Sequence, residues 1–168
     1  MTAFTAYLPR ILDRGNHEAA RDGSSTVEAH HLLLAIADDP EPSTHTVLAD
    51  AGLTYRALRD ALDREYEESL SAAGVSLAAF DLPKPTPAAG SQPSAGKSRR
   101  LKPGNSTRLA LVRGFGTVTR KRDLRPAHLL LGILRAPVGT VPRALALAGV
   151  DQGELIQHVQ DDLRRELL

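Results

Sequence analysis

Two short groups of residues in this 168-residue chain are of types that could support chemistry, but their spacing argues against each. Gly96-Lys97-Ser98 resembles the end of a phosphate-binding P-loop, yet Ser91 stands where that motif needs its first glycine, and the run lies in a proline-rich segment. His30-His31 suggests a metal site, but neighbours on a helix point about 100° apart and cannot chelate one ion. We therefore expect no metal site and no cofactor.

Carboxylates gather between residues 60 and 68, where paired acids could suggest acid–base catalysis. Their spacing spreads them around a helix surface, so we interpret them, Glu65 included, as a solvated face. No Ser/His/Asp group has a recognisable catalytic spacing either. We expect no catalytic residue and no enzymatic activity.

The charge is divided along the chain. Residues 1–75 carry six basic and thirteen acidic side chains, a net charge of −7, whereas residues 97–125 carry ten basic side chains against Asp123, a net charge of +9. The basic stretch could contact a phosphate backbone. Phe115 is the only aromatic residue among these basic residues that could stack on a base, and no base-reading motif appears. A nucleic-acid-associated regulatory protein is therefore the alternative hypothesis and not the leading one.

The composition describes a folded protein with an aliphatic core. Hydrophobic residues make up 42%, with three Tyr, three Phe and no Trp, which suits packed helices better than a β-sandwich. The chain has no Cys, which fits a reducing compartment. No signal peptide is recognisable, and no stretch approaches the roughly 18 apolar residues of a membrane span. We expect a soluble, cytoplasmic protein.

Hydrophobic spacing predicts an all-α fold. Phe4 to Leu12 has helical spacing, with Gly15 as a possible break. Ser25-x-x-Glu28 has the spacing of a capping box before a second helix. Residues 38–43 are predicted to form a loop and residues 46–51 a short helix. A fourth helix follows, in which Leu53, Ala57, Leu58, Ala61 and Leu62 form the apolar stripe.

The second half repeats this order at an offset of 97 residues. The segment His31-Leu32-Leu33-Leu34-Ala35-Ile36 corresponds to His128-Leu129-Leu130-Leu131-Gly132-Ile133, and Gly52 corresponds to Gly149. Residues 27–62 and 124–159 share eleven identities over 36 positions without a gap. Such self-similarity indicates a duplicated helical unit. Because His31 and His128 recur near a helix start, we expect a structural role for both, as a hydrogen bond to the backbone.

The repeated residues also resemble a known family. Glu18-Ala19-Ala20-Arg21, the Gly23 turn, Val27-x-x-x-His31-Leu32-Leu33-Leu34 and Ala51-Gly52-Leu53 are similar to the N-terminal repeat domain of Clp-family AAA+ unfoldases of the ClpA/ClpC type. The resemblance implies two tandem four-helix repeats related by pseudo-twofold symmetry, without the ATPase modules. We expect repeats at 1–77 and 107–168, packed as one domain, joined by a Pro/Gly/Ser-rich basic linker at 78–106.

The resemblance implies a recognition domain that binds substrates or adaptors of Clp ATPases, Clp-targeting cyclic peptides, or a Clp ATPase itself. The family binds phosphoarginine through a Glu before the repeated His and a Thr near each repeat start. Here the family's Thr-Glu is Ala29-His30 in one copy and Pro126-Ala127 in the other, so we expect that activity to be lost. We expect ligand contacts from the first helix of each repeat, at Phe4, Thr5, Leu8, Leu101, Lys102 and Pro103.

Overall fold

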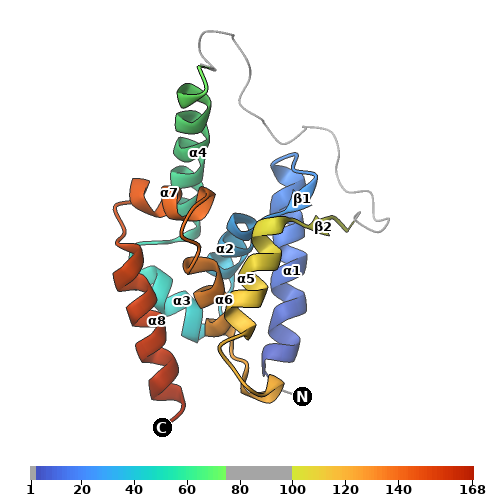
Figure 1. The fold of residues 1–168 in the computed structure, drawn as a ribbon, viewed down its shortest axis with the longest axis vertical. Coiled ribbons are helices and arrows are strands. Elements are labelled where there is room, and N and C mark those ends of the chain that lie inside the picture. Colours follow the sequence, from blue (N-terminus) through green and yellow to red (C-terminus); the bar gives the residue numbers. More distant parts are fainter. Residues whose placement is uncertain (1–2, 75–99) are drawn as a thin grey trace.

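The computed structural model describes residues 3–74 and 100–168, and these residues form an all-α fold (Figure 1). The first half contains α1 (Ala3–Arg21), α2 (Ala29–Asp38), α3 (Pro42–Asp50) and α4 (Tyr55–Ala72). The second half contains α5 (Asn105–Phe115), the 3-10 turn η1 (Lys121–Asp123), α6 (Pro126–Leu134), α7 (Thr140–Leu147) and α8 (Gln152–Glu166). Two-residue strands, β1 (Thr26–Val27) and β2 (Lys102–Pro103), pair in parallel. The predicted order of two four-helix repeats is confirmed.

The repeated apolar segments form the centre of the core. In α2, Leu32 to Ile36 are at most 1% exposed, and in α6, Leu129, Leu130 and Ile133 are fully buried. The two helices contact each other across the repeats. A helix that is apolar on all sides is stable only when other helices surround it, and here the flanking helices of both halves do so.

Both repeats end their third helix in the same way. Gly52 and Gly149 have φ values of +77° and +74°, in the left-handed region that favours glycine. After Gly52, the Leu53 amide donates to the Leu48 carbonyl at 2.8 Å, and after Gly149 the Val150 amide donates to the Leu145 carbonyl at 3.0 Å. The predicted 97-residue correspondence therefore extends to individual backbone hydrogen bonds.

The first helices of the repeats differ in length. Helix α1 has 19 residues and continues through Pro9 and Gly15, so the helix does not end at Gly15. A Cβ on Gly15 would lie 2.6 Å from Leu32 Cδ2, which means that this glycine allows α1 to approach α2 closely. Helix α5 has 11 residues and begins at Asn105, inside the segment predicted as linker. Residues 75–99 of that segment lie outside the described residues.

Two predicted boundaries are corrected. The capping box at Ser25-x-x-Glu28 is wrong, because β-branched Thr26 and Val27 are in β1 and α2 begins only at Ala29. Helix α3 begins at Pro42 and not at residue 46, since proline is well suited to the first helical turn. No helix among the described residues has the length and hydropathy needed to cross a bilayer.

The halves pack together at two separate corners, visible in Figure 1 as α4 with α7 at the upper end and α3 with α8 at the lower left. At the first corner Glu65 of α4 is only 6% exposed, so the prediction that it lies on a solvated face is wrong. Its Oε1 atom accepts a hydrogen bond from Arg143 Nε of α7 at 2.8 Å. An arginine 78 residues away in the sequence therefore covers this carboxylate.

Candidate functional site

The six residues predicted to bind a ligand fall at two different places. Phe4, Thr5 and Leu8 lie in the first half of α1, whereas the backbone amide of Leu101 donates to Asn16 Oδ1 at 2.7 Å, beside the second half of that helix. Because an α-helix rises 1.5 Å per residue, Phe4 and Asn16 are about 18 Å apart along the axis. The six residues do not form one site.

The first group forms an apolar patch with a residue that the sequence interpretation did not include. The ring of Phe4 lies edge-on to that of Phe115, with centroids 5.6 Å apart and planes at 89°. Phe4 is 6% exposed, Leu8 and Phe115 are half-buried, and Thr5 is exposed. We call Phe4, Thr5, Leu8 and Phe115 the Phe4 patch. It joins the first helices of the two repeats.

The second group is part of a connection between the repeats. Lys102 pairs with Thr26 and Pro103 with Val27 in the short parallel β-ladder, with the Lys102 and Pro103 side chains exposed. After the ladder, the Gly104 amide donates to the Val27 carbonyl at 2.8 Å. The Thr107 hydroxyl donates to the same carbonyl at 2.6 Å. Lys102 and Pro103 therefore have a structural role that the sequence did not indicate.

A carboxylate completes this connection. Glu28 accepts hydrogen bonds from the Thr26 hydroxyl at 2.7 Å, from the Ser106 amide at 3.3 Å and from the Ser106 hydroxyl. Burial alone would raise the pKa of Glu28, but the hydrogen bonds from Ser106 and Thr26 outweigh it and hold this pKa below its usual value. An anion of the first repeat thus occupies the N-terminus of α5, where the helix dipole favours negative charge. We call Thr26, Glu28, Ser106 and Thr107 the Glu28 clip.

His31 and His128 make the backbone hydrogen bond that we expected from their repeated position. His31 Nδ1 accepts from the Glu28 amide at 3.0 Å, and His128 Nδ1 accepts from the Arg125 amide at 2.9 Å. Each imidazole thereby satisfies an N–H group at the start of the central helix of its repeat. His31 Nε2 lies 3.2 Å from Asp22 Oδ2, which also accepts from Arg59.

His30 stands where the related family has its glutamate. Its ring lies against that of His31, with centroids 4.0 Å apart and planes tilted by 46°. Burial, together with the neighbouring His31, lowers the pKa of His30 to about 4. The group at this position is therefore a neutral imidazole at physiological pH and not an anion.

Asp22, His30 and His31 bring three possible metal-ligand atoms within 4.8 Å of one another, but their hydrogen bonds do not suit a metal. Because His31 Nδ1 accepts from a backbone amide, the proton of a neutral His31 is on Nε2, the nitrogen that faces Asp22. That nitrogen has no free lone pair, and Arg59 already neutralises Asp22 at 2.9 Å. We interpret the cluster as a structural network.

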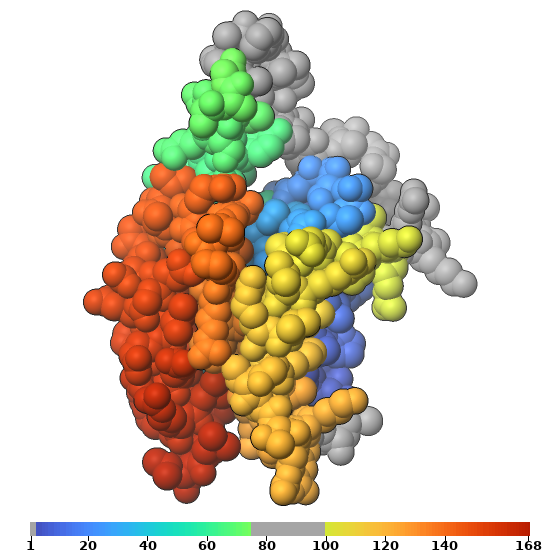
Figure 2. All heavy atoms as spheres, viewed as in Figure 1, coloured from blue at the N-terminus to red at the C-terminus, as the bar shows by residue number. Residues whose placement is uncertain are grey.

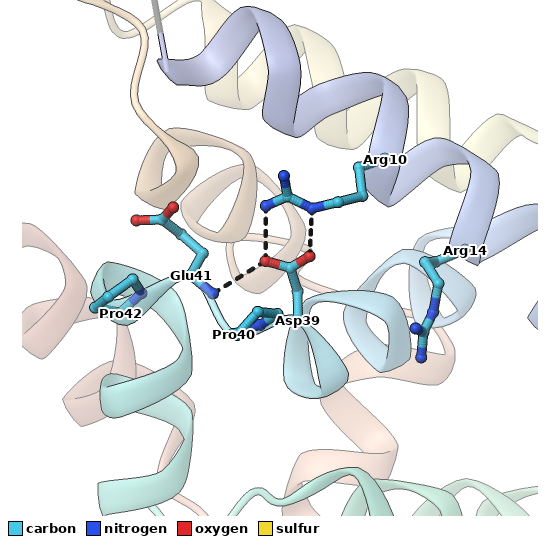
Figure 3. A pocket seen from close by; sticks show the side chains of 6 residues that line it. All are labelled: Arg10, Arg14, Asp39, Pro40, Glu41 and Pro42. Carbon is cyan, nitrogen blue, oxygen red and sulfur yellow. Dashed lines mark hydrogen bonds and ion pairs between the residues drawn. The ribbon is translucent and has the colours of Figure 1, made fainter.

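Two hollows adjoin the start of α3 and share Glu41 and Pro42 in their linings. The first, of about 400 Å³, is drawn in Figure 3, where Arg10 makes two hydrogen bonds to Asp39, at 2.7 and 3.0 Å. Its second arginine, Arg14, pairs with Asp38, so both arginines of this hollow are paired within the chain. The second hollow, of about 540 Å³, lies between α3 and α8, and we call it the α3–α8 groove. Its lining includes Ser43, Thr46 and Asp50 of α3 and His158, Asp162 and Glu166 of α8.

The basic stretch is exposed but spread out. Figure 2 shows α5 in yellow on the face of the molecule, and on its outer side Arg108, Leu109 and Val112 are exposed, the last by 70%. Arg100 and Lys102 precede this helix, and the basic residues 120–122 follow it, also exposed. The Arg113 guanidinium donates a hydrogen bond to the Gly132 carbonyl at 3.4 Å. Lys97 and Arg99 lie outside the described residues. The exposed cations thus occupy both ends of α5.

The fold and the repeated His-Leu-Leu-Leu helix define the class of protein. Residues 3–89 match the family model of the Clp repeat (R) N-terminal domain, and the chain belongs to this family. Nine chains of solved structures match it. One is the crystal structure of the N-terminal domain of the caseinolytic protease associated chaperone ClpD from Arabidopsis thaliana, with 21% identity and a TM-score of 0.61 over 93% of this chain and 91% of that one. None of the curated proteins searched matches.

Membership of the family confirms the predicted relationship and the all-α fold. It also supports, in general terms, a Clp-related module that binds substrates or adaptors. The ligand and the residues that bind it are the subject of the proposals that follow.

Proposed function

We propose that this chain is a cytoplasmic, non-catalytic module that binds an apolar segment of a protein or a cyclic peptide at the Phe4 patch. The observation that carries this proposal is the contact of buried Phe4 in the first repeat with half-buried Phe115 in the second, with half-buried Leu8 one turn after Phe4 on α1. Pockets for peptides are predominantly apolar with a few polar groups. Leu8 supplies half-buried apolar surface here, and Thr5 is an exposed polar residue next to Phe4.

Two roles fit such a module. As an adaptor or regulator, it would present partners to a Clp ATPase or bind the ATPase itself. As a decoy, it would sequester cyclic-peptide antibiotics aimed at Clp proteolysis. Both roles use the same patch and differ in the ligand.

Phosphoarginine is not the proposed ligand. The family's glutamate is replaced by neutral His30 in the first repeat and by Ala127, which is 2% exposed, in the second. Neither side chain can form the paired, charge-assisted hydrogen bonds that a carboxylate makes with a guanidinium group. The nearby carboxylate of Glu28 is already held by Thr26 and Ser106.

The test is affinity capture from native cell extract with two matched variants, Leu8→Lys in the Phe4 patch and Leu109→Lys on the outer face of α5. We expect wild type and Leu109→Lys to recover a Clp ATPase or its adaptors, and Leu8→Lys to lose them. Thermal shift with Clp-targeting cyclic peptides then separates the roles, because stabilisation of wild type and Leu109→Lys, but not of Leu8→Lys, indicates the decoy. Recovery of nucleic acid, weakened steeply by salt, would instead favour the basic stretch as the functional surface.

A further inference from the structure

The two corners where the repeats meet are related by the 97-residue offset, yet one is closed and the other is open. At the closed corner, between α4 and α7, Arg143 Nε donates to Glu65 Oε1 at 2.8 Å. The Ser69 hydroxyl donates to the same oxygen at 2.7 Å. Arg64 of α4 donates to the Leu147 carbonyl of α7 at 3.0 Å. Two arginines therefore join the helices of this corner.

At the open corner, between α3 and α8, the corresponding positions have no arginine. The offset places Thr46 where the other repeat has Arg143, and Asp161 where it has Arg64. A carboxylate is kept, because Asp162 corresponds to Glu65. A further carboxylate is gained, since Asp50 corresponds to Leu147. The groove of about 540 Å³ lies at this corner.

The groove has a charge that the chain itself does not neutralise well. Glu41, Asp50, Asp162 and Glu166 line it, against one arginine, Arg165. Arg165 pairs with Asp162 at 3.2 Å from the same helix, with its side chain 74% exposed. Such an exposed pair within one helix contributes little and is easily replaced. The lining therefore favours a cation from outside.

We propose that the α3–α8 groove binds an arginine side chain from an exposed segment of a partner protein. The guanidinium group binds Asp162 as Arg143 binds Glu65 at the closed corner, so the second repeat supplies an internal example of the interaction. Arginine fits better than lysine because its planar fork matches a carboxylate with two parallel hydrogen bonds. The Thr46 side chain is short, and it leaves room for the incoming stem. This proposal rests on the peptide-recognition part of the proposed function but uses a different surface.

The probe is the peptide N-acetyl-Gly-Ser-Arg-Ser-Gly-amide, titrated into the whole chain and followed by two-dimensional amide NMR. We expect one equivalent to bind, with shifts concentrated at residues 43–50 and 158–166. Replacing the arginine by neutral citrulline should weaken binding at least tenfold. So should Thr46→Arg, which restores the closed-corner arginine, and Asp162→Asn. Glu154→Gln, the same charge change at the exposed start of α8, should leave affinity within twofold.

The converse variant, Arg143→Thr, opens the other corner, and it should create a second site for the same peptide if circular dichroism shows it to be folded. Unchanged binding to Thr46→Arg, equal binding of the citrulline peptide, or shifts elsewhere on the chain would overturn the proposal, as would the absence of binding at millimolar peptide. Because the capture experiment depends on Leu8 and this one does not, failure here leaves the Phe4 patch proposal standing, and the reverse also holds.

Discussion

Gly132 of α6 lies directly against Gly114 of α5, and a Cβ on Gly132 would be 2.7 Å from the Gly114 nitrogen and 2.1 Å from the Ala110 carbonyl oxygen. The backbones of α5 and α6 therefore contact each other directly at this crossing, with no side chain between them. In the first repeat the position equivalent to Gly132 is Ala35, and the glycine at the contact of the first and central helices is Gly15 instead.

This close approach predicts a large effect of one methyl group. Gly132→Ala should destabilise the protein by about 3 kcal/mol, because the new Cβ meets backbone atoms that cannot move without separating α5 from α6. The matched control is Gly153→Ala in α8, where a Cβ would meet nothing nearer than Asp151 Oδ1 at 3.3 Å. Urea denaturation measures both. A Gly132→Ala variant as stable as the control would contradict the packing described.

The Glu28 clip predicts a stability effect that depends on pH. Glu28→Gln should cost about 1–2 kcal/mol at neutral pH, since charge-assisted hydrogen bonds from Ser106 and Thr26 are weakened. The pKa of Glu28 is below its usual 4.5 in the folded chain, so its stabilisation is present above that pH and is lost as the pH falls through the folded value. The difference between wild type and variant, from urea denaturation, should shrink under acid conditions. Glu68→Gln, on the exposed side of α4, serves as the control and should show no such difference.

His30 predicts a second pH dependence, at higher pH. In the unfolded chain its pKa is near 6.5, but in the folded chain burial lowers it to about 4. The unfolded state therefore takes up a proton first, and stability falls as the pH drops from about 6.5 to 4, by up to about 3 kcal/mol. His30→Gln should reduce this loss, whereas His45→Gln, at an exposed position on α3, should not. Equal slopes for the two variants between pH 7 and 4.5 would show that His30 is accessible to protons.

Phosphoarginine binding can be tested directly. Titration of free phosphoarginine to millimolar concentration should leave the amide resonances around His30 and Ala127 unchanged, because neither repeat has a carboxylate there. Inorganic phosphate at the same concentration controls for general anion binding to the basic residues. Saturable shifts at either position with phosphoarginine alone would show that the activity has been retained through other residues.

The sequence predicts well those features that depend on neighbours along the chain. The apolar run before Ile36, the left-handed Gly52 and the repeated His31 each have a local signature, and the duplication doubles that signal. The helix start at Ala29 was predicted incorrectly because β1 depends on a partner strand 76 residues away. Glu65 was assigned to the surface because Arg143, which covers it, belongs to the other repeat.

The candidate site was harder to predict than the fold. An ungapped offset aligns Thr5 with Lys102, which suggested that both lie on equivalent helix positions and in one groove. In the structure Lys102 is in β2, because α5 starts later and is shorter than α1. Phe115, the true neighbour of Phe4, has no equivalent in the first repeat that would have identified it. The α3–α8 groove is recognisable only when the two corners are compared in three dimensions.

The Glu28 clip has a consequence for how the protein unfolds. Its hydrogen bonds, the Arg143–Glu65 pair and the Asn16–Leu101 contact each join residues from opposite halves. Neither half can open without breaking them, so we expect the two halves to melt in a single cooperative transition. A ligand held at one corner of the molecule therefore raises the same melting temperature as a ligand held at the other, and the two stabilisations add.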